Sequence, residues 1–146
     1  MYKTSIRISV LAYALAAATL ALAGDDPGHE RHELMEGVRD AAKPVGAMLK
    51  GEADYDQAVL MTSLETFASA ADQLGGLFPD GSEGGEAAPA IWEDRAGFEA
   101  AIVQWQEATA AAIEANPATL DDAKPVTGPI FGACKDCHDT YRIEEE

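Results

Sequence analysis

Apolar residues fall into four stripes with helical spacing. After Asp25 they recur at intervals of three and four residues, which predicts an amphipathic helix ending at the turn of residues 51–54. Pro44 interrupts this stripe, and because the stripe continues beyond it we expect a kink and not an end. Asp54 or Asp56 is expected to cap the second helix. The second stripe has heptad spacing, typical of helices that cross at small angles, and comprises Leu60, Leu64, Phe67, Ala71, Leu74 and Phe78.

Turn-forming residues separate the other two stripes. Residues 79–85 are rich in Pro, Gly, Asp and Ser and predict a loop. A third helix is expected to follow from Ile91 to Ile113, ended by Asn116-Pro117. In the last helix, prolines 125 and 129 are expected in or before the first turns, where proline costs least. Its apolar face would carry Ile130, Phe131, Cys134, Cys137, His138 and Tyr141.

The four segments and their short links predict one all-α domain. Amphipathic helices of this length, joined by short connections, form an antiparallel four-helix bundle. No strand alternation, internal repeat or second domain is visible in the 146 residues. Large apolar residues are few, so the protein core by itself would be thin.

The N-terminus has the pattern of a secretory signal peptide. Lys3 and Arg7 precede a largely apolar run over residues 8–22, and Ala21-Leu22-Ala23 supplies a small-x-small cleavage site. A retained anchor is the alternative, but the run is short for a membrane span. We expect a signal peptide over residues 1–23 and a mature domain over 24–146 that is not membrane-bound.

The mature chain is strongly acidic. Without Lys3 and Arg7, eight basic residues oppose 26 acidic ones, a net charge of −18 with histidine neutral. Such a surface repels nucleic acid and anionic lipid, and would attract a basic partner. Because the acids are scattered, solubility or tolerance of salt is the favoured explanation.

The last predicted helix contains Cys134-Lys135-Asp136-Cys137-His138. C-x-x-C-H is the attachment pattern of c-type haem, and on a helix all three functional side chains share a face. A thioredoxin-like dithiol, half a zinc site and a structural disulfide are alternatives. No other cysteine and no βαβ pattern is present, so haem is favoured. Attachment of c-type haem takes place outside the bacterial cytoplasmic membrane, in agreement with the signal peptide.

Three local motifs lie between residues 27 and 142. The chain ends with C-x-x-C-H-x-x-Y-R at residues 134–142, Glu83-Gly84-Gly85 precedes Pro89-Ala90-Ile91-Trp92, and Lys50-Gly51-Glu52 precedes Tyr55-Asp56. Over this range they resemble the C-terminal motif, the loop before the third helix and the first interhelical turn of the cytochrome c′ family, the class II c-type cytochromes. The resemblance implies a four-helix bundle with one covalent haem c, held by the C-terminal helix through Cys134, Cys137 and His138.

The same resemblance assigns two residues of the first helix. Arg31 would bond a haem propionate, with a solvated surface arginine as the alternative, and Met35 would face the distal side of the haem. If the Met35 sulfur binds iron, the protein belongs to the low-spin His/Met subclass and carries electrons. If Met35 only packs there, the iron is five-coordinate and binds nitric oxide or carbon monoxide. His29 and His32 are the other possible ligands, more often solvated surface residues.

The signal peptide and the haem motif together predict where the protein acts and what it does. The protein is expected in the periplasm, where it is not an enzyme but exchanges single electrons with redox partner proteins or, alternatively, binds a diatomic gas. A buried porphyrin would supply apolar volume that the core lacks, so the haem-free chain should be less stable. The family resemblance further implies a homodimer.

Overall fold

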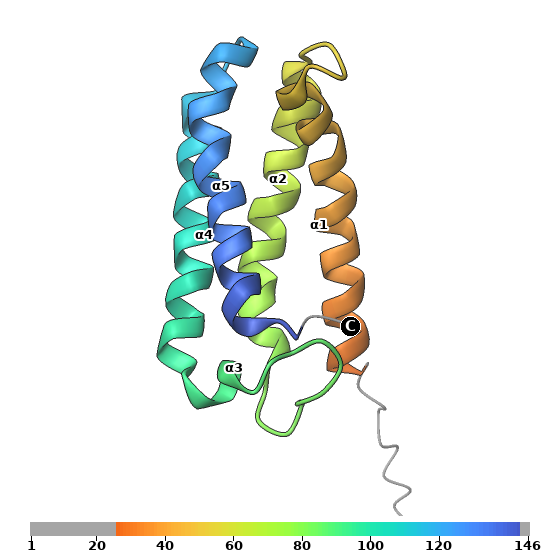
Figure 1. The fold of residues 1–146 in the computed structure, drawn as a ribbon, viewed down its shortest axis with the longest axis vertical. Helices are drawn as coiled ribbons and strands as arrows, with labels where there is room; N and C mark the ends of the chain where they lie inside the picture. The colour runs from red at the N-terminus through yellow and green to blue at the C-terminus, as the bar shows by residue number, and fades with distance from the viewer. Residues whose placement is uncertain (1–25, 144–146) are drawn as a thin grey trace, which may run out of the picture.

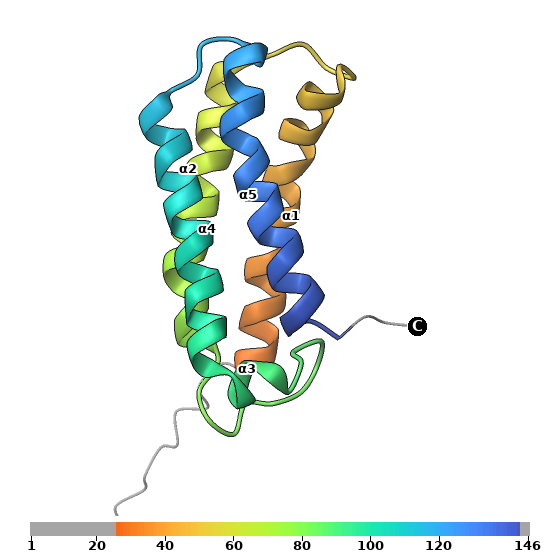
Figure 2. The same ribbon diagram turned by 60° about the vertical axis from the view of Figure 1, so that its left-hand side comes forward.

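A four-helix bundle forms the described part of the chain, residues 26–143 of a computed structural model (Figures 1 and 2). This confirms the predicted fold. The predicted signal peptide and residues 144–146 lie outside this part. Within residues 26–143, no helix is both long and apolar enough to cross a membrane. The elements are α1 (Pro27–Lys50), α2 (Gln57–Leu74), the 3₁₀ helix η1 (Gly75–Leu77), α3 (Ala90–Glu93), α4 (Arg95–Ala115) and α5 (Leu120–Tyr141).

Local capping sets the ends of the first two helices. The Asp26 side chain accepts a hydrogen bond from the Gly28 amide, and α1 ends at Gly51 in the left-handed conformation, φ 74°. The helix continues through Pro44, as predicted. Asp56, one of the two expected caps, accepts bonds from two amides at the start of α2.

The third predicted helix is interrupted, which corrects the expectation of one helix from Ile91. Asp94 separates α3 from α4 with φ −125° and ψ 61°, and its side chain accepts a hydrogen bond from the Gly97 amide. An aspartate that bonds the backbone in this way competes with helix continuation. The end at Asn116 is confirmed, with φ 42°.

Two further boundaries differ from the prediction. Phe78 lies beyond η1 and outside α2, because the helix ends before Gly75-Gly76. Helix α5 begins at Leu120, capped by Thr119, so Pro125 and Pro129 lie inside it. Both prolines are exposed while Ile130 is buried, so the apolar face of α5 is preserved around them.

The core lies mainly around α2, whose heptad residues face the other helices. Helix α4 packs extensively on α5, α1 on α2, and α2 on α4, whereas α1 and α5 contact each other sparsely. The fourth side of the bundle, between α1 and α5, is therefore the one with the least direct helix packing. The largest fully buried side chains are Leu60, Leu64, Ile91, Ile130, Val45, Thr109 and Thr127.

Two loops are tied together at one end of the bundle. The Tyr55 hydroxyl, before α2, donates to the Pro117 carbonyl, before α5. Gln57 donates to the carbonyl and side-chain oxygens of Asn116 at 3.2 and 3.1 Å. Burial, with Asp122 and Asp56 nearby, raises the pKa of Tyr55 above its ordinary value of 10.0.

Replacing Tyr55 should remove the hydrogen bond that connects these two loops. We expect Tyr55→Phe to lower the free energy of unfolding by about 1 kcal/mol at neutral pH, since one hydrogen bond is lost. The folded wild type keeps the phenol proton to higher pH than the unfolded chain. Its stability is therefore greatest below pH 10.0 and falls as pH rises through the higher folded pKa.

Denaturant unfolding of the haem-loaded protein between about pH 8 and 11 measures the effect. The alkaline loss should be shallower in the variant and not absent, because the pKa of Tyr141 is also raised, by burial and Asp94. Identical pH slopes for the two proteins would contradict the role of Tyr55.

Gly97, in the first turn of α4, has no room for a side chain. A Cβ built there collides with the Asp94 carboxylate and with the Tyr141 hydroxyl. These two groups are hydrogen-bonded to each other and so connect α5 to the break between α3 and α4. We expect Gly97→Ala to lose about 1–3 kcal/mol of unfolding free energy, although alanine is the better helix former. Gly128→Ala in α5 is the control, because nothing lies within 4 Å of its Cβ. A Gly97→Ala protein as stable as the control would exclude the collision.

Candidate haem site

A cavity of about 610 Å³ lies between α1, the end of α5 and the segment before α3. Its size is in the range of cofactor sites in proteins. The walls are mainly apolar and aromatic, with a few polar groups from α1 and α5. They include Met35, Phe78, Ile91, Phe98, Cys137 and His138.

The C-x-x-C-H motif lies on the last two turns of α5. Cys137 and His138 line the cavity. Cys134 does not line it but is half-buried against the core one turn earlier. All three residues therefore lie on one helix, as predicted, and their roles toward a haem stay predictions. An imidazole and a thiol at the wall of an apolar cavity, with a second thiol one turn earlier, fit a covalently attached haem.

Burial controls the protonation of these groups. It raises the pKa of the Cys134 thiol to about 11, with a smaller contribution from Cys137, and it also raises the pKa of Cys137. The pKa of His138 is lowered, first by burial and then by the Arg142 charge. The imidazole is thus held neutral, the form that binds a metal.

Met35 enters the same cavity from α1. Its side chain is half-buried and packs against the core. Met35 and His138 thus line one cavity from different helices, so that α1 supplies one of its walls and α5 another. This arrangement suits either a thioether ligand or an apolar cover.

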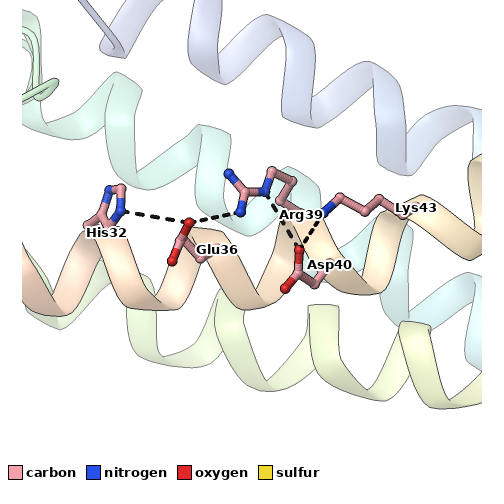
Figure 3. A network of polar contacts seen from close by, with 5 residues as sticks. All are labelled: His32, Glu36, Arg39, Asp40 and Lys43. Carbon is pink, nitrogen blue, oxygen red and sulfur yellow. Dashed lines mark hydrogen bonds and ion pairs between the residues drawn. The ribbon is translucent and has the colours of Figure 1, made fainter.

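The two histidines near the start of α1 are exposed, as expected. His29 does not line the cavity, whereas His32 reaches its rim while its side chain stays 60% exposed. His32 begins a row of charged contacts along α1, shown in Figure 3. Exposed pairs of this kind contribute little to stability, because water screens them. The row continues through Glu36, Arg39, Asp40 and Lys43, with the Arg39–Glu36 and Lys43–Asp40 pairs at 2.8 Å.

Arg31 is buried, with 8% of its surface exposed, so the solvated-surface alternative is wrong. Its guanidinium lines the cavity and donates to the carbonyl oxygens of Leu77 and Ser82, each at 3.0 Å. It also lies 4.8 Å from the centre of the Phe78 ring. The propionate contact stays a prediction, and the protein partners were not foreseen from the sequence.

An aromatic row supports the end of α5. The Phe78 and Phe98 rings meet edge to face at 4.8 Å, and Phe98 meets Tyr141 in the same way at 5.3 Å. The Tyr141 hydroxyl donates to Asp94 at 3.3 Å. The apolar stripe predicts Phe78 as part of the second helix, whereas the structure places it at the cavity. The neighbouring Pro79 and the loop that follows indicate in the sequence that Phe78 lies beyond the helix.

Comparison with known proteins agrees with this site. The family model described as Cytochrome C' matches residues 26–142. A cytochrome c′ of Rhodopseudomonas palustris is 37% identical, with 96% of this chain and 98% of that protein covered. A solved cytochrome c′ from Rhodopseudomonas palustris has a TM-score of 0.80 at 36% identity, covering 84% of this chain and all of that one.

A further solved structure is a nitric oxide complex of a mutant cytochrome c prime from Alcaligenes xylosoxidans. Its TM-score is 0.73 at 28% identity, with 81% of this chain and 94% of that chain covered. The chain belongs to the cytochrome c′ family, whose members carry covalently bound haem c with its iron.

Proposed function

We propose that this chain transfers single electrons in the periplasm. Cys134 and Cys137 hold the haem through thioethers, His138 is the proximal iron ligand, and Met35 is the distal one. The observation that carries the proposal is that Met35 and His138 enter one cavity from facing helices. When bound, the haem iron would supply a one-electron couple, whose potential a methionine ligand would raise.

The protein contributes positioning, proton control and exclusion of water. Helix α5 keeps the two thiols and the imidazole on one face. Burial and Arg142 keep His138 neutral, so that a ring nitrogen is free to act as a ligand. Phe78, Ile91 and Phe98 make the cavity apolar, and a dry shell of this kind tunes the potential of a metal site.

Gas binding is the alternative function. It is supported by the related mutant cytochrome c prime that was solved with nitric oxide. Methionine is a flexible side chain, and α1 packs only sparsely on α5. Met35 would then cover an open distal position where a diatomic gas binds.

The proposed function includes a location in the periplasm and assembly as a homodimer. The signal-like residues 1–23 support export to the periplasm, where c-type haem is attached. There the chain acts as a carrier or a binding protein and not as an enzyme. Its partners are redox proteins, or a gas in the alternative function. Pairing as a homodimer follows the resemblance to the family.

Replacing Met35 separates the two functions. We expect the wild-type ferric protein to be low-spin, and Met35→Ala to become high-spin and to bind carbon monoxide readily, because the distal ligand is lost. The reduction potential should fall by roughly 100 mV or more. Optical spectra and redox titration of the purified proteins measure both effects.

Met61→Ala is the matched control. Met61 packs against the core from α2 and does not line the cavity, so its loss should leave the spin state unchanged. A high-spin wild type that binds carbon monoxide without any mutation would reject the Met35-ligated carrier and favour the gas-binding function.

A further inference from the structure

The 78–89 loop, between η1 and α3, crosses the end of the cavity. Figures 1 and 2 show it at the lower end of the bundle, near the first turn of α1 and the last turn of α5. It contributes Phe78, Gly84, Gly85, Glu86 and Ala87 to the cavity wall. Helices α1 and α5 contact each other sparsely, and hydrogen bonds join this loop to both of them.

On the α5 side the link is made by the backbone. The Ala88 amide donates to the Tyr141 carbonyl at 3.0 Å, and the Ile143 amide donates to the Glu86 carbonyl at 2.8 Å. Ala87 and Arg142 form a bridge between these two bonds. Side-chain substitution would leave these contacts in place, so the loop is fixed to the end of α5.

On the α1 side, the hydrogen bonds to this region within the described residues all come from one side chain, Arg31. Its Nη1 donates to the Leu77 carbonyl at 3.0 Å and to Ser82 Oγ at 3.2 Å. Its Nη2 donates to the Ser82 carbonyl at 3.0 Å and to the Gly84 carbonyl at 3.5 Å. The guanidinium also lies over the Phe78 ring. A planar fork with donors on both nitrogens suits this set of acceptors, which a lysine ammonium cannot span.

Two glycines adapt the loop to this contact. Gly84 and Gly85 have φ of 129° and 61°, values that other residues rarely adopt. They turn the backbone so that the Gly84 carbonyl faces Arg31 while both residues line the cavity. The backbone conformation of these two glycines therefore directs a loop carbonyl oxygen to the Arg31 guanidinium.

The donors of Arg31 are largely occupied. A guanidinium has five N–H groups, and the four on Nη1 and Nη2 match the four contacts to residues 77–84. Only the Nε–H is left for an outside acceptor. A bidentate bond to a haem propionate could use the Nε–H and one Nη N–H, and it would then require at least one of the loop contacts to break.

We infer that Arg31 is a positioning residue, which fastens the 78–89 loop to α1 and thereby fixes the separation of α1 and α5 across the haem cavity. Met35 lies one turn beyond Arg31 on the same helix, so the contact also holds Met35 relative to His138. Loss of Arg31 loosens the distal wall and lets small ligands reach the iron faster. The inference rests on the proposed haem site, whichever of the two functions it serves.

The test uses the haem-loaded protein and two arginines that bond the same segment. Arg31→Gln removes the contact from α1. Arg95→Gln removes a 2.8 Å bond to the Phe78 carbonyl from α4, and Arg95 does not line the cavity. Amide exchange of residues 77–88 reports on the loop, and carbon monoxide association with the ferrous protein reports on the distal wall.

We expect Arg31→Gln to accelerate both processes by about tenfold, because several bonds to a charged group are lost together. Arg95→Gln should change carbon monoxide association by less than about twofold. Arg31→Lys, which keeps the charge without the fork, should lie between wild type and Arg31→Gln.

Unchanged association in Arg31→Gln, or equal acceleration in Arg95→Gln, overturns the inference. If Arg31→Gln does not accumulate, Ser82→Ala is the second test. It removes the Arg31 bond to Ser82 Oγ together with the bond of that hydroxyl to the Pro79 carbonyl. Faster association supports the inference, and an unchanged rate rejects it. Failure of the haem site itself is distinguishable, since wild type would then show no haem absorption.

Discussion

The placement of Cys134, Cys137 and His138 on one helical face is the constraint on which the rest of the structure depends. A haem joined to both thiols and bound by the adjacent imidazole, as proposed, could not leave α5, so the bundle would have to supply an apolar space beside that face. The row of Phe78, Phe98 and Tyr141 rings holds the end of α5 in place beside the cavity.

The sparse contact between α1 and α5 follows from the same constraint. Three sides of the bundle are closed by helix packing, whereas the fourth contains the cavity and is bridged by the 78–89 loop. A bound haem adds apolar contacts to both helices, so binding and folding are thermodynamically linked. Arg31 contributes to this side of the bundle because it joins α1 to the 78–89 loop, which lines the cavity.

The sequence predicts the bundle because its apolar stripes have helical periods, and it predicts the C-x-x-C-H face because the spacing is local. Apolar spacing continues through Asp94, so the break there depends on a carboxylate that caps a helix end and leaves the stripe intact. The hydrogen-bond partners of Arg31 could not be predicted from the sequence, since they lie 46 to 53 residues away, at the end of η1 and in the irregular loop after it. Whether Met35 binds iron depends on a helix separation that no pattern of residue types encodes.

The most direct test of the account is the state of Cys134 and Cys137 in protein purified from the periplasm. Acid–acetone extraction followed by mass spectrometry should find one haem per chain that stays with the polypeptide, attached to the peptide that contains both cysteines. Exchange of both cysteines for serine should abolish the attachment. Free or disulfide-linked cysteines in a colourless wild-type protein would contradict the account.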